Sequence, residues 1–257
     1  MRRPLELYDR AAGYADLWIE RSFTRPPEYE TVSLNAALRD VEQRLGAVSG
    51  VLEERPLREV EENTRRLLRE IRGRDPFRPR WAADSLLARC CYAVCRLLKP
   101  DVVVETGVAY GVSSAFILTA LRENGRGVLH SVDLPPLTRR YGEFWGIAVD
   151  RTLEARWDVH RGSSKRVLPG LLEKVGAIDL FLHDSLHTRR NMRREFEAVW
   201  PNLRDDGVLL ADDVERNAAF GELRRKNPAL WRVVRDRQER PLHSKAAPKA
   251  TFGVVVK

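Results

Sequence analysis

The feature that most constrains the fold is a change of pattern at Asp101. Before that residue, apolar side chains recur mainly at helical spacing. After it, short β-branched or apolar runs alternate with helical segments as far as Lys257. This alternation predicts an α/β fold, in which a doubly wound and mostly parallel sheet of seven strands carries helices on both faces.

The strands and helices after Asp101 are placed by their residue types. Val102–Val104 is a continuous β-branched run, which is typical of a strand buried on both faces. Six further strands are predicted at 127–134, 157–160, 178–182, 208–211, 231–235 and 252–256. Helices are predicted between them at 112–122, 165–174, 188–200 and 220–226. The last two strands have no helix between them, so we expect an antiparallel hairpin at one edge of the sheet.

The first part of the chain predicts a helical extension. We expect residues 1–80 to form this extension and residues 81–257 to form the ligand-binding domain. Amphipathic helices are predicted at 34–45 and 57–71, with Ser33 as the N-cap of the first of them. An earlier short helix has an aromatic side, which we expect to dock on another surface; it contains Tyr8, Tyr14, Leu17, Trp18, Ile19 and Phe23.

Composition excludes several classes of protein. The net charge is +8, from 45 Lys and Arg against 37 Asp and Glu, but these residues are spread along the chain, which disfavours nucleic acid as a partner. Cys90, Cys91 and Cys95 lie too close together for a disulfide framework. The sequence has no apolar stretch near the roughly 18–20 residues of a membrane helix and no signal-peptide core, so we expect a cytoplasmic protein.

Two strand ends predict a ligand site. The first strand leads into the loop Glu105–Gly111, whose glycines let backbone N–H groups approach a ligand, and Glu105 can hold an ammonium group. The second strand ends at Asp133, which is placed to bind ribose hydroxyls. The glycine spacing differs from Gly-x-Gly-x-x-Gly, which disfavours a dinucleotide, and no phosphate-binding Gly-Lys-Ser/Thr is present.

From about residue 95 onward the sequence resembles the class I S-adenosylmethionine-dependent methyltransferases. The resemblance implies that the Glu105–Gly111 loop wraps the methionine part of the cofactor and that Asp133 binds its ribose. The segment 161–171 is similar to the adenine side of catechol-type O-methyltransferases, and 181–188 with 208–214 resembles a bacterial branch near the catechol and macrolide-sugar O-methyltransferases. The implied cofactor-binding residues are Glu105, Gly107, Tyr110, Gly111, Ser113, Asp133, Ser163, Ser164 and Asp184.

Three acidic residues follow the fourth and fifth predicted strands. Asp184 follows the fourth strand, and Asp212 and Asp213 follow the fifth. Neighbouring strand tips lie about 5 Å apart, and converging carboxylates suit Mg²⁺. The resemblance supports this ligand set, because related O-methyltransferases hold a divalent metal at these two strand tips. The chain departs from those relatives at His183 and Asp213, where Asp and Asn are usual.

The same region offers a general base. Histidine has an ordinary pKa near 6.5 and can accept a hydroxyl proton near neutral pH, so His187 and His183 are candidate catalytic residues. Asp184, which lies between them in the sequence, is the third candidate. His130 and His160 lie within predicted strands, and we expect them to be structural.

Together these features predict methyl transfer from S-adenosylmethionine to a hydroxyl of a small molecule. The alternatives are an RNA or protein methyltransferase and a cofactor-binding protein without catalysis. The extension is expected to act as a lid, to shape the acceptor pocket or to form a homodimer. Candidate walls of the acceptor pocket are Trp18, Trp81, Tyr141, Phe144 and Trp145.

Overall fold

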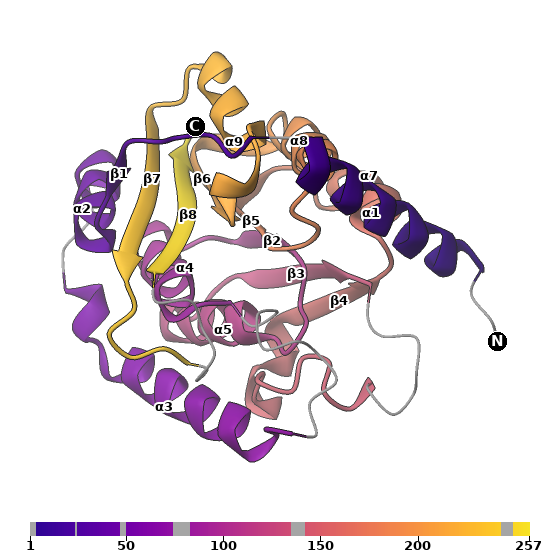
Figure 1. Ribbon diagram of the computed structural model, residues 1–257. Coiled ribbons are helices and arrows are strands. Elements are labelled where there is room, and N and C mark those ends of the chain that lie inside the picture. The colour runs from indigo at the N-terminus through magenta and orange to yellow at the C-terminus, as the bar shows by residue number, and fades with distance from the viewer. Residues whose placement is uncertain (1–3, 24, 47–49, 74–82, 135–141, 243–248) are drawn as a thin grey trace.

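The computed structural model describes residues 4–23, 25–46, 50–73, 83–134, 142–242 and 249–257, which form one eight-stranded sheet with helices on both faces (Figure 1). The strands are β1 (Thr31–Val32), β2 (Val102–Thr106), β3 (Val128–Asp133), β4 (Trp157–Arg161), β5 (Ile178–His183), β6 (Leu203–Asp212), β7 (Leu230–Arg237) and β8 (Lys249–Val256). The α-helices are α1 (Pro4–Phe23), α2 (Leu34–Leu45), α3 (Arg55–Glu70), α4 (Ser85–Leu98), α5 (Val112–Asn124), α7 (Ser164–Val175), α8 (Arg189–Val199) and α9 (Ala219–Glu222). Short 3₁₀ helices are η1 (Val51–Glu53), η3 (Arg151–Arg156), η4 (Val214–Arg216) and η5 (Leu223–Lys226).

The strand order is β1-β7-β8-β6-β5-β2-β3-β4. Neighbouring strands are parallel except where β8 pairs with β6 and β7, which confirms the doubly wound, mostly parallel sheet and the antiparallel pair near its edge. From β2 the chain passes to β3 on one side, and it later returns to β5 on the other. The point where the order reverses therefore lies between β2 and β5, which is where open α/β sheets bind ligands.

Two details of the sheet differ from the prediction. The strand count was one too low, because the two-residue β1 pairs with β7 and two residues are too short to show a period of two. The strand predicted at 208–211 also begins too late, since β6 already begins at Leu203. Its pairing with β5 shifts register between Ile178 and Leu180, so the strand passes through an irregularity instead of ending.

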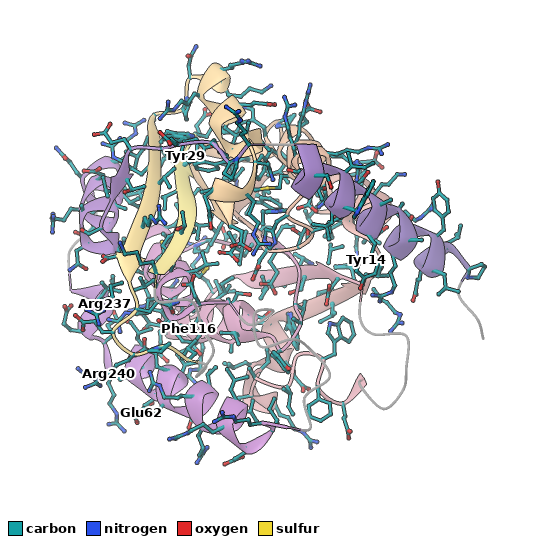
Figure 2. All side chains as sticks on the ribbon, viewed as in Figure 1. Tyr14, Tyr29, Glu62, Phe116, Arg237 and Arg240 are labelled. Carbon is teal, nitrogen blue, oxygen red and sulfur yellow. The ribbon has the colours of Figure 1, made fainter. Side chains whose placement is uncertain are left out.

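The sheet has a hydrophobic cluster on each face. Val103 belongs to the cluster that includes α4 and α5, whereas Val104 belongs to the one that includes α7 and α8. This alternation follows from the period of two in a strand. Figure 2 shows side chains filling the space between helices and sheet, and Phe116 of α5 is fully buried there.

Most of the N-terminal extension shares this core. Leu38 of α2 and Leu57 of α3 are buried in the same cluster as α4 and α5. Ser33 caps α2 as predicted, since its side chain accepts a hydrogen bond from the backbone N–H of Ala36 at 3.2 Å. The three cysteines are buried on α4 without a disulfide. In the part of the chain that the structure describes, no helix is both long and apolar enough to cross a membrane.

Helix α1 leaves its aromatic side exposed in this chain, so docking of that side stays a prediction. Tyr8, Tyr14 and Trp18 are 61%, 65% and 68% exposed, so the aromatic side does not dock on the rest of the chain. The polar side faces inward instead. Asp9 pairs with Arg166 of α7, and Asp16 pairs with Arg190 of α8, which places α1 (indigo) across these two helices in Figure 1.

Candidate functional site

Hydrogen bonds beyond the strand ends hold four loops together at the carboxyl edge of the sheet. The backbone N–H of Gly107 donates to Val132 at 2.9 Å, and that of Asp184 donates to Thr106 at 2.9 Å. On the other side, the N–H of Gly162 donates to Asp133 at 2.8 Å. The loops after β2, β3, β4 and β5 are therefore fixed relative to one another at the switch point.

The glycines of the predicted loop allow a close approach between protein backbones, and their approach to a ligand stays a prediction. Gly107 has φ +94°, and a Cβ atom there would lie 2.0 Å from the carbonyl oxygen of Asp184. Gly111 has φ +76°, and its Cβ would lie 2.9 Å from the Cα of Gly146. Both positions need glycine, because the backbone is left-handed and the neighbouring atoms are backbone atoms. The loop after β2 thus touches the loop after β5 directly.

Glu105 lies beneath this loop and not in it. Its carboxylate is fully buried and accepts hydrogen bonds from the hydroxyls of Ser113 at 3.1 Å, Ser131 at 2.5 Å and Ser114. Burial raises the pKa of Glu105 to about 7, although the three serines oppose this effect. Ser113, predicted to bind the cofactor, serves here as a donor to Glu105. Binding of an ammonium group by Glu105 stays a prediction.

Asp133 is at the tip of β3, as predicted, and holds the glycine loop. Its Oδ2 accepts hydrogen bonds from the indole Nε1 of Trp145 at 2.7 Å and from the backbone N–H of Ala109 at 3.3 Å. Its Oδ1 accepts one from the N–H of Leu134 at 2.8 Å. Burial raises the pKa of Asp133 and these hydrogen bonds lower it. Burial is the larger effect, so the pKa lies above its usual value. The carboxylate therefore has a pre-formed set of donors, one of which is a side chain.

The two serines predicted on the adenine side meet other helices. The hydroxyl of Ser163 donates to Asp9 of α1 at 2.6 Å, and that of Ser164 donates to Asn191 of α8 at 3.5 Å. The guanidinium of Arg10 donates to the carbonyl of Leu134 at 2.9 Å. Helix α1 consequently covers the carboxyl edge beside β3 and β4. Tyr110, also predicted to contact the cofactor, is buried in the core.

An acidic and histidine cluster lies next to the glycine loop. His187 Nε2 is 3.6 Å from Asp184 Oδ1 and 3.9 Å from Asp212 Oδ2, and its Nδ1 is 3.5 Å from Asp213 Oδ2. One ligand atom from each of Asp184, His187 and Asp212 lies within 4.8 Å of the others, a spacing suited to a metal ion. Asp213 instead pairs with Arg216 at 2.5 Å. The structure thus brings all three predicted carboxylates together around His187.

Electrostatics in this cluster favour a cation. Burial, followed by repulsion from neighbouring carboxylates, raises the pKa of Asp184 and Asp212 well above the usual value. Burial also lowers the pKa of His187 well below its usual value, so its imidazole is neutral. Within the described residues, Nε2 of His187 is buried and has no hydrogen-bond partner. A neutral imidazole nitrogen beside two buried carboxylates can bind a metal ion or accept a proton.

Sequence reasoning missed a fourth acidic residue close to this cluster. Asp84 is the N-cap of α4 and accepts hydrogen bonds from the N–H groups of Leu86 and Leu87. Burial raises its pKa to about 6, and Asp213 contributes to the rise. The signal was present, since Asp directly before an apolar helix is a typical N-cap.

His183 lies at the end of β5 beside this cluster, with its ring edge-on to that of His187 and the two ring centroids 5.3 Å apart. Its Nδ1 is 2.7 Å from Oε2 of Glu195 on α8, and it is fully buried. Glu195 also accepts hydrogen bonds from Thr106, Ser185 and Asn191. Within the described residues, Nε2 of His183, like that of His187, is buried without a hydrogen-bond partner. The bond to Glu195 holds the His183 ring in the core, whereas Nε2 of His187 faces the carboxylates of Asp184 and Asp212, so His187 is the stronger candidate base.

The predicted pocket walls are only partly described. Phe144 is buried in the core, Trp145 is bonded to Asp133, and Trp18 faces outward. Trp81 and Tyr141 lie outside the described residues.

A groove of about 650 Å³ lies between α1 and α8 and is lined by acidic and basic residues that include Glu20, Lys165 and Arg189. The lining of that groove contains no residue of the glycine loop.

Comparisons with known proteins test the predicted fold. Residues 104–214 match the family model described as a methyltransferase domain. An O-methyltransferase from Bacillus cereus in complex with SAH is 14% identical with a TM-score of 0.52, covering 86% of this chain and 97% of that chain. A methyltransferase from Geobacter sulfurreducens is 18% identical with a TM-score of 0.52, covering 85% and 96%. TomG from Streptomyces achromogenes, involved in tomaymycin synthesis and in complex with SAM, is 15% identical with a TM-score of 0.50, covering 86% and 95%. No curated protein matches the chain. These similarities confirm the predicted fold.

Proposed function

We propose that this chain, which has the fold and the matched domain of the class I methyltransferases, transfers the methyl group of S-adenosylmethionine to a hydroxyl of a small molecule. The observation that carries the proposal is the contact between Gly107 and Asp184. It joins the loop assigned to the cofactor to the cluster that can activate a hydroxyl. Similar proteins that are O-methyltransferases with SAM or SAH bound support the same reaction.

The residues have separate tasks in this proposal. The Gly107–Gly111 loop and Asp133 bind and orient the cofactor, whose sulfonium supplies an activated methyl group. His187, neutral and lacking a hydrogen-bond partner on Nε2 among the described residues, accepts the proton of the hydroxyl or helps to bind a metal. Helix α1 covers the carboxyl edge and excludes water from it.

The cluster fits a divalent metal ion. Asp184 and Asp212 would supply carboxylate oxygens and His187 an imidazole nitrogen, with Asp213 close by. Oxygen-rich ligands favour Mg²⁺ or Mn²⁺. When bound, such an ion lowers the pKa of a coordinated hydroxyl. Asp184 and Asp212 would hold it beside the glycine loop.

The direct test is an assay with methyl-labelled S-adenosylmethionine and a panel of small catechols, phenols and hydroxylated sugars, with RNA and protein as further acceptors. Label in a small hydroxylated product supports the proposal. Label only in RNA or protein would replace it with the first alternative. Binding of S-adenosylmethionine without transfer to any acceptor, and without an acceptor cavity in the bound protein, would favour the non-catalytic alternative.

Asp133→Ala is expected to weaken binding of S-adenosylhomocysteine by about 1–3 kcal/mol, the scale of a lost hydrogen bond to a charged group. Titration calorimetry measures the change, and circular dichroism checks the fold. Asp150→Ala is the matched control, because Asp150 is an exposed carboxylate that caps η3 and should leave affinity unchanged. Equal affinity of a folded Asp133→Ala variant and the wild type would remove the ribose-binding role.

We also propose that α1 pairs subunits through its outer side. Within the described residues, six of the seven exposed large hydrophobic side chains lie on α1, namely Leu5, Leu7, Tyr8, Tyr14, Trp18 and Ile19. A contiguous apolar side on a helix whose polar side faces inward indicates a further contact. Sedimentation velocity should show a dimer for the wild type and a monomer for Trp18→Glu. A monomeric wild type at micromolar concentration would contradict the proposal.

A further inference from the structure

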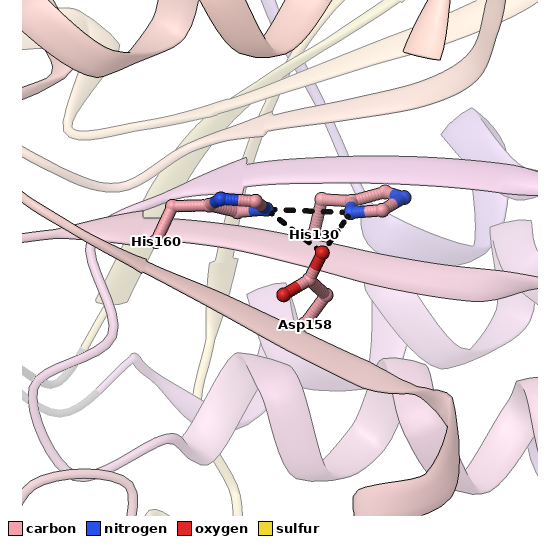
Figure 3. A group of neighbouring side chains, drawn as sticks. All are labelled: His130, Asp158 and His160. Atoms are coloured by element: carbon pink, nitrogen blue, oxygen red, sulfur yellow. Dashed lines mark hydrogen bonds and ion pairs between the residues drawn. The ribbon is translucent and has the colours of Figure 1, made fainter. Parts of the chain in front are cut away.

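A second group of potential metal ligands lies away from the site described above, on the edge of the sheet. Figure 3 shows His130 of β3 with Asp158 and His160 of β4, their polar atoms directed to one point. His130 and Asp158 are paired across the two strands, and His160 follows Asp158 by two residues on the same strand. Strand periodicity therefore places all three side chains on one face.

The distances match a tetrahedral ion. Nδ1 of His130 is 3.3 Å from Oδ2 of Asp158, Nε2 of His160 is 3.2 Å from the same oxygen, and the two nitrogens are 3.4 Å apart. A tetrahedral zinc site with bonds of about 2.0–2.1 Å has ligand atoms about 3.3–3.4 Å apart. The three atoms thus already form one face of such a tetrahedron.

The surroundings leave the ligand atoms available. The side chains of His130 and His160 are 14% and 20% exposed, and that of Asp158 is 47% exposed, so solvent can reach the group. Burial lowers the pKa of His130, with His160 and Lys174 adding to the effect and Asp158 opposing it.

We propose that His130, Asp158 and His160 bind a divalent transition-metal ion of the zinc class, with water in the fourth position. Two imidazoles and one carboxylate suit Zn²⁺, Co²⁺ or Ni²⁺ and disfavour Mg²⁺, which requires oxygen ligands. The site is distinct from the Asp184 cluster, because β2 and β3 separate β5 from β4. An ion here joins β4, the edge strand, to β3 and so stabilises the turn that leads to Ser163.

The test is titration calorimetry with Zn²⁺ alone on four proteins: wild type, His160→Asn, Asp158→Asn and His187→Ala. His187→Ala removes the only histidine of the Asp184, His187 and Asp212 group, which is the other group of potential metal ligands among the described residues. We expect the wild type and His187→Ala to bind Zn²⁺ with the same affinity. The affinity should be at least about tenfold lower in His160→Asn and Asp158→Asn, because even the loss of a residue that only supports a metal ligand lowers metal affinity by about this factor.

Two further measurements keep the result interpretable. Co²⁺ should give the visible absorption of a tetrahedral site in wild type and His187→Ala but not in His160→Asn. Zn²⁺ should raise the melting temperature of the wild type and of the control Asp205→Asn, an exposed carboxylate on β6, but not that of Asp158→Asn. Zn²⁺ binding that is unchanged in folded His160→Asn and Asp158→Asn would overturn the proposal, whatever the outcome of the methyl-transfer assay.

Discussion

His187→Ala is expected to lower kcat for methyl transfer by about 10²- to 10⁴-fold, the range for loss of a general acid or base. Its imidazole lies between Asp184 and Asp212, next to the loop assigned to the cofactor, so either as base or as metal ligand it acts on the acceptor hydroxyl. Affinity for S-adenosylhomocysteine should stay close to that of the wild type, because Asp133 and the glycine loop remain. Steady-state kinetics and calorimetry on one preparation measure the two quantities.

Excess chelator separates the two roles of the cluster. If a metal activates the hydroxyl, chelation and Asp212→Ala both abolish turnover and leave cofactor binding nearly intact. Asp205→Ala, an exposed carboxylate on the same strand, is the control and should keep full activity. Full activity in chelator would exclude the metal and leave His187 as the base. If His187→Ala were also fully active, the enzyme would act only by holding the cofactor and the acceptor close together in the right orientation.

Glu195→Gln is expected to destabilise the fold by about 3–5 kcal/mol, the cost of removing one partner of a buried ion pair. Glu195 is 1% exposed and accepts hydrogen bonds from Thr106, Ser185 and Asn191 besides its pair with His183. In glutamine an NH₂ group replaces one of the two carboxylate oxygens. This NH₂ group would face the groups that donate hydrogen bonds to Glu195, so one hydrogen bond would be lost. Urea unfolding at pH 7 measures the loss.

The pH dependence of stability gives an independent check. Burial alone would raise the pKa of Glu195, but the ion pair and hydrogen bond with His183 outweigh it and lower the pKa to about 2, from an ordinary 4.5. Because the pKa is lower in the folded state, this stabilisation is present above pH 4.5 and is lost as the pH falls towards 2. The Gln variant should lack that part of the acid dependence.

Glu197→Gln is the control for Glu195→Gln. Glu197 is an exposed neighbour paired with Arg193, so this variant should change stability by less than about 1 kcal/mol. Equal losses from the two variants would contradict the buried network.

The sequence predicted the strand tips well for a physical reason. Gly107 and Asp133 follow short apolar runs, and strand length and chain order alone bring such residues to one edge. Glu195 was missed although it has a readable signal. It follows Met192 by three residues and precedes Phe196, so it lies on the apolar face of a helix, where a carboxylate needs partners.

Other features depend on contacts that no local pattern contains. The inward polar side of α1 is fixed by ion pairs to Arg166 and Arg190, more than 150 residues away, and not by its own periodicity. The hydrogen bond from Trp145 to Asp133 likewise depends on how the chain returns over the glycine loop. The convergence of His130 and His160 on Asp158 could not be predicted either, because it requires the register between β3 and β4.

The most direct test of the account is a crystal structure with S-adenosylhomocysteine bound in buffer containing Mg²⁺. We expect the ribose hydroxyls to bind the carboxylate of Asp133, with the Trp145 indole displaced from Oδ2. We expect the sulfur to point towards Asp184, His187 and Asp212. Ligand bound in the groove between α1 and α8, with Asp133 still hydrogen-bonded to Trp145, would contradict the assignment of the carboxyl edge as the cofactor site.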